Sequence, residues 1–254
     1  MHFTLKRQTV PVNVATWASL EARVAERFAR REGFALATIN LDHLVKLNTS
    51  PAFRAAYAAQ DFIVADGNPI VWMSRMARRP VELIPGSEAI LPLSRIAARQ
   101  GVKVAFAGST AQALAAAKAY LEREVPNLEV VCCIAPPMGF DAASPQSVKI
   151  LKEIEESGAG LCFVALGAPK QELFAATGRR VAPGVGFASI GAGLDFFAGT
   201  QKRAPDWARR YAVEWLWRMM ANPKRLGLRY IKCFAILPGQ MLRAVALRVK
   251  GTGA

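Results

Sequence analysis

The chain has 254 residues, 52% of them hydrophobic and 20% charged, which allows one substantial folded domain plus an appendage and excludes a disordered protein. Its 33 Lys and Arg residues against 19 Asp and Glu give a formal net charge of +14, which suits a phosphate-rich partner such as an anionic bilayer, a nucleic acid or a diphosphate-bearing lipid. The cysteines lack metal-ligand or CxxC spacing, and two histidines, His2 and His43, are too few for a zinc site or a Ser-His-Asp hydrolase.

Short apolar runs alternate with helical patterns over the first 200 residues. The buried strands are predicted at residues 35–39, 62–65, 102–107, 128–133, 161–166 and 185–190. The clearest helix is predicted from Thr110 to Val125, with a cap at Ser109 or Thr110 and a stop at Pro126. This alternation predicts an α/β fold with a mostly parallel, twisted sheet and helices on both faces.

Near residue 200 the strand signals stop and basic aromatic helices are predicted. Residues 202–254 contain twelve Lys and Arg against two acids, Asp206 and Glu214, with aromatic side chains between the cations. A merely solvated face would carry more balancing acids, so this composition favours a membrane surface. We therefore predict a catalytic core over 1–199 and a basic, amphipathic, membrane-binding appendage over 200–254.

A membrane-spanning helix is not expected, because it needs about 20 uninterrupted apolar residues. The best candidate, Ile231–Val249, is interrupted by Lys232, Pro238, Arg243 and Arg248. The first ten residues have no apolar run behind their Lys-Arg pair, so no signal peptide is expected either. These features predict a cytoplasmic protein for which the membrane is a surface.

Polar residues and glycines follow the predicted strands. They form the segments Asn40–His43, Asp66–Pro69, Gly108–Thr110, Gly167–Glu172 and Gly191–Asp195. In open α/β sheets ligands bind beyond the carboxyl ends of the strands, where small residues allow close approach and helix N-termini favour anions. The pattern predicts a site for a phosphorylated ligand, such as a nucleotide.

Asp66 is the best candidate for a general base, because it ends a strongly apolar strand and precedes a glycine. The alternative is a turn-capping aspartate. A predicted helix begins with Lys170, Gln171 and Glu172. The lysine could bind a phosphate, and the other two side chains could bind hydroxyls or the edge of a base. The alternative there is a capping box with a solvated face.

Several common nucleotide-binding devices are missing. The chain has no GxxxxGK[ST] P-loop and no Asp-x-Asp, and Gly184–Gly186 and Gly191–Gly193 only loosely resemble a dinucleotide fingerprint. A diphosphate leaving group would then be neutralised by Arg and Lys instead of a metal ion.

An ordered set of motifs covers residues 38 to 230. It comprises Thr38-x-Asn40-x-x-His43, Ala65-Asp66-Gly67, Gly86-Ser87, Gly167-Ala-Pro-Lys-Gln-Glu172, Gly191-x-x-x-Asp195-Phe-x-x-Gly199, Arg203-Ala-Pro-x-Trp207, Glu214-Trp-Leu-Trp-Arg218 and Asn222-Pro-x-Arg225 through Arg229-Tyr230. The set resembles the WecG/TagA/CpsF family of bacterial glycosyltransferases, glycosyltransferase family 26.

The resemblance implies a Rossmann-like core and a mobile C-terminal appendage that completes the active site on the membrane. It also implies an inverting transfer, without cofactor or metal, of a hexose-type sugar from a UDP-sugar to a polyprenyl-diphosphate-linked glycan in cell-surface or exopolysaccharide biosynthesis. The sugar would be N-acetylmannosamine, mannosaminuronic acid or glucose. The protein would lie on the inner face of the cytoplasmic membrane and would not bind nucleic acid, and a homo-oligomer is left open.

The resemblance also assigns roles to residues. Asp66 would take the proton of the acceptor hydroxyl, with Thr38 and Asn40 beside it. The nucleotide-sugar pocket would be lined by Gly108, Gly167, Lys170, Gln171, Glu172 and Asp195. The departing UDP would be neutralised by Arg203, Arg218, Arg225 and Arg229.

One segment departs from the family pattern. The family commonly has Arg and Asp where this chain has Leu83 and Glu88, which leaves the donor sugar open. The rival interpretations are a non-catalytic nucleic-acid-binding or membrane-surface protein, and a nucleotide-sugar epimerase or dehydrogenase. The first two do not account for the polar segments after the strands. The third needs a dinucleotide fingerprint that the chain lacks.

Overall fold

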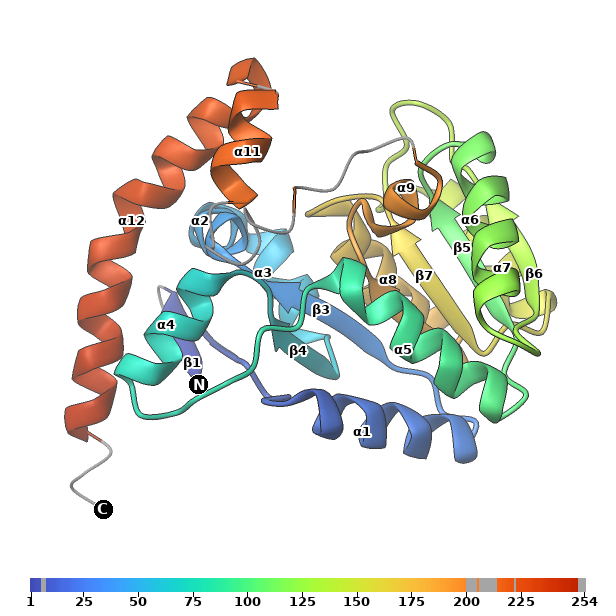
Figure 1. Ribbon diagram of the computed structural model, residues 1–254, viewed down its shortest axis with the longest axis horizontal. Coiled ribbons are helices and arrows are strands. Elements are labelled where there is room, and N and C mark those ends of the chain that lie inside the picture. Colours follow the sequence, from blue (N-terminus) through green and yellow to red (C-terminus); the bar gives the residue numbers. More distant parts are fainter. Residues whose placement is uncertain (6–7, 200–204, 206–213, 222, 251–254) are drawn as a thin grey trace.

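The computed structural model describes residues 1–5, 8–199, 205, 214–221 and 223–250. Its centre is a six-stranded parallel sheet in the order β4-β3-β8-β7-β5-β6 (Figure 1). The strands are β3 (Ala35–Ile39), β4 (Phe62–Ala65), β5 (Val104–Gly108), β6 (Val130–Ile134), β7 (Leu161–Ala165) and β8 (Gly186–Ser189). All six predicted strands are confirmed, with ends shifted by at most two residues.

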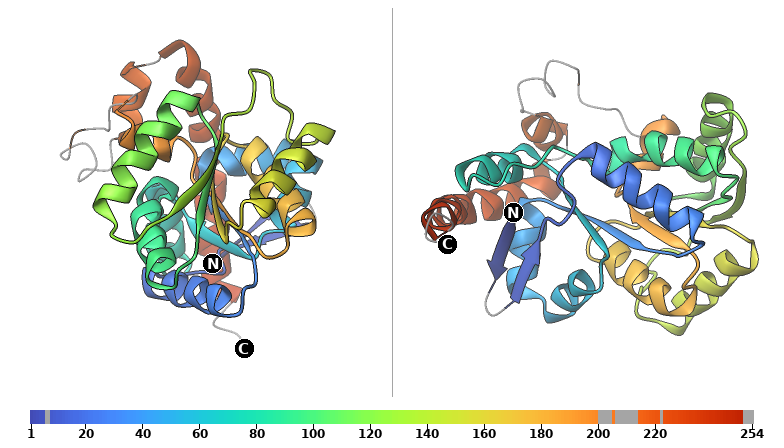
Figure 2. Two further views of the ribbon diagram at one scale, coloured as in Figure 1. Left: turned by 90° about the vertical axis from the view of Figure 1, so that its right-hand side faces the viewer. Right: turned by 90° about the horizontal axis from the view of Figure 1, so that it is seen from below.

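Helices cover both faces of this sheet (Figure 2). One face carries α1 (Trp17–Ala29), α5 (Gly86–Arg99), α6 (Ala111–Glu124) and α9 (Gly193–Phe197). The other carries α2 (Leu41–Thr49), α3 (Pro51–Ala58), α7 (Pro145–Glu156) and α8 (Lys170–Val181). The predicted Rossmann-like α/β fold is confirmed.

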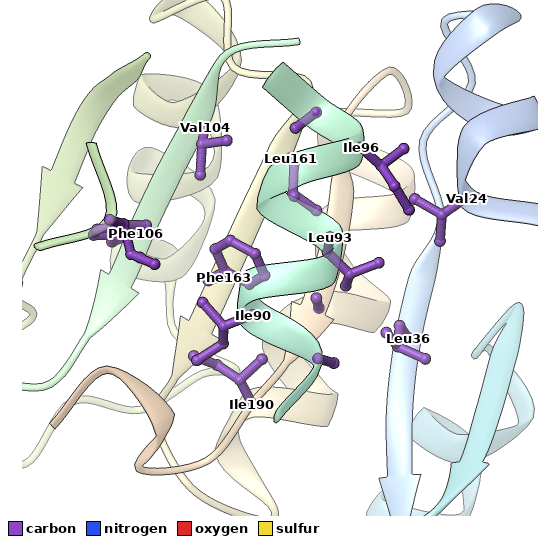
Figure 3. Close-up of a cluster of buried hydrophobic side chains, with 14 of the residues drawn as sticks. Val24, Leu36, Ile90, Leu93, Ile96, Val104, Phe106, Leu161, Phe163 and Ile190 are labelled. Carbon is purple, nitrogen blue, oxygen red and sulfur yellow. The ribbon is translucent and has the colours of Figure 1, made fainter. Parts of the chain in front are cut away.

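Five strands of the sheet are buried along their whole length, which is why they are short and largely apolar, and the edge strand β6 is partly exposed. On one face α5 lays Ile90, Leu93 and Ile96 against β3 and β7 (Figure 3). Phe163, in the middle of β7, is 0% exposed. This rigid centre fixes where each strand ends.

The predicted helix after β5 is also confirmed. It is α6, whose first turn is capped by the Thr110 hydroxyl accepting from the Ala113 amide at 3.2 Å, and which ends before Val125. The N-terminal hairpin of β1 (His2–Leu5) and β2 (Gln8–Pro11) is not predicted from the sequence. Its strands have four residues each, too few to show a period.

Three further helices lie at one end of the sheet: α4 (Asn68–Met76), α11 (Glu214–Ala221) and α12 (Pro223–Lys250). Helix α12 runs beside α2 and α4 (Figure 1) and buries Ala244 in the same apolar cluster as those helices. The predicted helical appendage is therefore confirmed in its described part. The proposed boundary at 199/200 borders residues outside the described ranges.

The expectation that no segment spans a membrane stays a prediction, although one helix meets the criteria of length and composition. Residues Leu226–Val249 of α12 form a helix long and apolar enough to cross a membrane, because an 18-residue window holds no more than two charged residues. A helix packed on a protein core passes the same test, and α12 does pack on α2 and α4. Length and composition are therefore the same for a helix that crosses a membrane and for one that packs on the protein.

Candidate active site

The carboxyl ends of the parallel strands bring the predicted polar segments to one edge of the sheet. In sheet order the strands end in Asp66 after β4, Asn40 after β3, Gly191 beyond β8, Gly167 beyond β7 and Gly108 at the end of β5. This is the edge at which open α/β sheets bind ligands.

Two side-chain donors converge on one oxygen of Asp66. The Thr38 hydroxyl and the Asn40 amide Nδ2 each lie 3.4 Å from Asp66 Oδ2. Asn40 also caps α2, since its Oδ1 accepts from the His43 amide at 3.0 Å. That cap orients the Asn40 amide, so its nitrogen faces the carboxylate. The structure thus brings together the three residues predicted to form the catalytic group.

A buried aromatic cluster holds the backbone of Thr38. The Tyr57 hydroxyl donates to Thr38 O at 2.5 Å, and His43 Nδ1 lies 2.7 Å from both that oxygen and the Tyr57 hydroxyl. Burial lowers the pKa of His43 to about 4, although the Thr38 hydrogen bond and the charge of Asp42 favour protonation. The imidazole is therefore neutral at neutral pH, and its role is to support β3.

An ion-pair cluster joins α2 to two other parts of the chain. Lys46 Nζ lies 2.7 Å from Asp42 Oδ2 and donates to Ala168 O at 3.0 Å, which ties α2 to the turn after β7. Arg229 Nε of α12 lies 3.3 Å from Asp42 Oδ1. Arg229, predicted to meet the leaving group, is thus held at the start of α2.

The residues that open α8 split into one exposed and two buried side chains. Lys170 is exposed, whereas Gln171 and Glu172 are buried. Gln171 Oε1 accepts from the Gly191 amide at 3.0 Å, and Gln171 Nε2 donates to Glu172 Oε1 at 2.9 Å. The alternative of a capping box is wrong, because the N-cap is Pro169 and no side chain caps the helix.

The other two predicted pocket residues near β5 have structural partners. The Ser109 hydroxyl donates to Asp195 Oδ1, which links the end of β5 to α9. Gly108 has a φ of 117°, and a Cβ there would lie 2.3 Å from Ala165 O of the neighbouring strand. The close approach of β7 therefore explains this glycine without a ligand. Gly167, with a φ of 69° and open space around it, forms the turn that leads into α8.

The remaining predicted cations are only partly described. Arg203 lies outside the described residues. Arg218 belongs to α11 and Arg225 to α12 by their backbone, and their side chains lie outside the description. Among the described residues, no group of three or more His, Cys, Asp or Glu side chains is arranged to hold a metal ion.

The two residues that depart from the family pattern have different surroundings. Leu83 is half-buried against the apolar cluster of α2, α4 and α12, and Glu88 is exposed in the first turn of α5. Two cavities of about 330 and 320 Å³ lie elsewhere, one between α6 and β6 and one between β2 and α3. Neither cavity is lined by a predicted site residue.

The sequence placed Asp42 and Ser109 in the polar segments after the strands without assigning them these contacts, and it did not single out Lys46 or Tyr57. Asp42 and Lys46 lie four residues apart on α2, a spacing that indicates an ion pair. Tyr57 gave no such signal, because its partner at Thr38 is 19 residues away.

The chain matches the model of the Glycosyl transferase WecG/TagA/CpsF family over residues 6–251. A similar protein of Bacillus spizizenii (strain ATCC 23059 / NRRL B-14472 / W23) is 27% identical over 198 residues, which cover 77% of this chain and 74% of that protein. It is named N-acetylglucosaminyldiphosphoundecaprenol N-acetyl-beta-D-mannosaminyltransferase.

Proposed function

The chain belongs to the WecG/TagA/CpsF family of glycosyltransferases, glycosyltransferase family 26, and on that premise we propose that it moves a hexose-type sugar from a UDP-sugar to a polyprenyl-diphosphate-linked glycan. The name of the Bacillus protein supports an acceptor of this class, a sugar on a diphosphate-linked polyprenol. It also makes N-acetylmannosamine the first donor sugar to test, followed by mannosaminuronic acid and glucose.

The observation that carries the proposal is the Asp66 carboxylate with two donors on one of its oxygens. In the proposed reaction an acceptor hydroxyl gives its proton to Asp66 while its oxygen bonds to the anomeric carbon. The bond from that carbon to the diphosphate breaks, and its electron pair leaves with UDP. A single displacement at the anomeric carbon, assisted by one base, inverts the configuration of that carbon without a covalent enzyme intermediate.

The developing charge on UDP needs cations, and we propose that arginines supply them in place of a metal ion. Arg203, Arg218, Arg225 and Arg229 are the candidates on the C-terminal part of the chain. The ion pair between Arg229 of α12 and Asp42 of α2, the helix that Asn40 caps, supports this role because it brings one of the four arginines next to the edge of the sheet.

A lipid-linked acceptor places the reaction at a membrane, and the exposed faces of α11 and α12 support such a location. Large apolar side chains are exposed there at Leu216, Trp217, Met220, Leu228, Ile231 and Phe234. Together with the cations of these helices they suit a peripheral contact with the anionic, inner face of the cytoplasmic membrane.

The proposal is tested by measuring UDP release from a panel of UDP-sugars, with and without a short-chain polyprenyl-diphosphate-sugar acceptor and EDTA. We expect acceptor-stimulated, EDTA-resistant release with one donor, reduced about 10²–10⁴-fold in Asp66→Asn. The matched control is Asp141→Asn, which changes an exposed aspartate before α7 and should leave the rate unchanged. Equal release by Asp66→Asn and the wild type would refute the role of Asp66.

A further inference from the structure

Gln171 and Glu172 are buried and bond to protein groups, although they were expected to bind a ligand at the open edge. Only 3% of Gln171 and 0% of Glu172 is exposed. The Gln171 amide uses both of its ends, one toward the Gly191 backbone at 3.0 Å and one toward Glu172 Oε1 at 2.9 Å. A chain of hydrogen bonds therefore runs from the turn after β8 into α8.

The chemistry of the bonded groups fixes which end of the Gln171 amide accepts a hydrogen bond and which end donates one. The backbone N–H of Gly191 only donates, so the Gln171 atom that faces it has to be the carbonyl oxygen. The Gln171 amide nitrogen then faces Glu172, which has to present an acceptor. A carboxyl group in either protonation state presents one, and so does the carbonyl of a glutamine.

The carboxyl group of Glu172 is enclosed by protein in this structure. Its second oxygen, Oε2, is buried and has no hydrogen-bond partner among the described residues. Burial raises the pKa of Glu172 to about 7, although its hydrogen bond to Gln171 and the charge of Lys46 act in the opposite direction. Below that pH the group is neutral, so it supplies shape and a hydrogen bond instead of charge.

The Gly191 turn, to which Gln171 is hydrogen-bonded, lies at the centre of the candidate site. Gly191 follows β8, the strand between β3 and β7, and its φ of 59° turns the backbone toward α9. The turn thus separates the β3 end, with Thr38 and Asn40, from the β7 end, where Gly167 begins the turn into α8. A displacement of the Gly191 turn would change the spacing between these two parts of the site.

Resting on the proposed function, we propose that Glu172 is a positioning residue: through Gln171 it holds the Gly191 turn against α8 and shapes the donor-sugar site without touching the donor. This role differs from the pocket-lining role that the family resemblance implies for Glu172. It predicts that the acceptor atom of residue 172 matters and that its acidity does not.

Steady-state kinetics separate these roles. We expect Glu172→Ala to raise the KM for the UDP-sugar about tenfold, the effect of one lost buried hydrogen bond, with kcat within about threefold of the wild type. Glu172→Gln keeps the acceptor and should restore KM to within about threefold. Glu156→Ala and Glu156→Gln, at an exposed glutamate ending α7, are the matched controls. Equal impairment of Glu172→Gln and Glu172→Ala would overturn the proposal, and so would a wild-type KM in Glu172→Ala.

Hydrogen exchange of the Gly191 amide gives a second readout that needs no turnover. We expect Glu172→Ala to speed this exchange about tenfold and Glu172→Gln to leave it unchanged, while the amide of Phe106 in β5 stays protected and reports an intact fold. If Glu172→Ala does not fold, Gln171→Ala removes the same link and should speed exchange equally. Unchanged exchange at Gly191 would overturn the proposal. The exchange measurement requires no turnover. If the protein used no UDP-sugar, the proposed function would be refuted, and the exchange rates would still test the positioning role of Glu172.

Discussion

Replacing Glu172 by glutamine should stabilise the protein above neutral pH. Burial raises the pKa of this carboxyl from its ordinary value of 4.5 to about 7, outweighing its hydrogen bond from Gln171. The charges that face it are Lys46 and Asp42 from α2, and the Tyr57 hydroxyl faces it from α3. Lys46 favours ionisation and Asp42 opposes it, so neither partner removes the cost of burial.

The direction of the effect follows from proton binding. Between pH 4.5 and about 7 the folded protein holds the Glu172 proton that the unfolded chain releases, so the free energy of unfolding falls as the pH rises. At about 1.4 kcal/mol for each pH unit between the two pKa values, the loss approaches about 3 kcal/mol above pH 7. Glu172→Gln has no proton to release and escapes this loss.

Urea unfolding at pH 5 and pH 8 measures the difference. We expect Glu172→Gln to exceed the wild type by less than about 1 kcal/mol at pH 5 and by about 3 kcal/mol at pH 8, with equal m-values. The exposed control Glu156→Gln should show no such divergence. A difference between Glu172→Gln and wild type that is the same at both pH values would refute the burial argument.

Two further substitutions test the support of the site. Tyr57→Phe removes the hydroxyl that donates to β3 and should lower the free energy of urea unfolding by about 1 kcal/mol, an expectation that unchanged stability would contradict. Gly108→Ala forces a side chain to within 2.3 Å of Ala165 O at a φ of 117°, and we expect a loss of about 3 kcal/mol or more in the same assay. Gly101→Ala, with a φ of 64° and open space, should cost only about 1 kcal/mol, and equal losses at the two glycines would contradict the clash.

The strands and the site edge could be predicted because their causes are local. A parallel strand covered by helices on both faces is mostly apolar, so the strands of the sheet stand out in the sequence as short apolar runs. The chain leaves such a strand through polar residues and glycines, which is how Asp66, Asn40 and Gly167 could be found. Parallel strands place these ends on one edge, so the convergence follows from the fold class.

The supporting contacts could not be predicted in the same way. Arg229 carries the charge expected of a leaving-group cation, and only the docking of α12 decides that its guanidinium meets Asp42. Gln171 and Glu172 fit the pattern of ligand-binding residues at a helix start. Their burial depends on how α8 lies over the sheet, which no local pattern contains.

The amino-acid sequence by itself determined the α/β fold, the family, the strand ends and the candidate base, because periodicity, burial and motif order are properties of short segments. Only the tertiary structure decided the sheet order, the place of β8 between β3 and β7, and therefore which turn Gln171 meets. It also decided which polar groups near the open edge face inward. Both outcomes depend on contacts between segments far apart in the chain, whose geometry is set when the whole core packs.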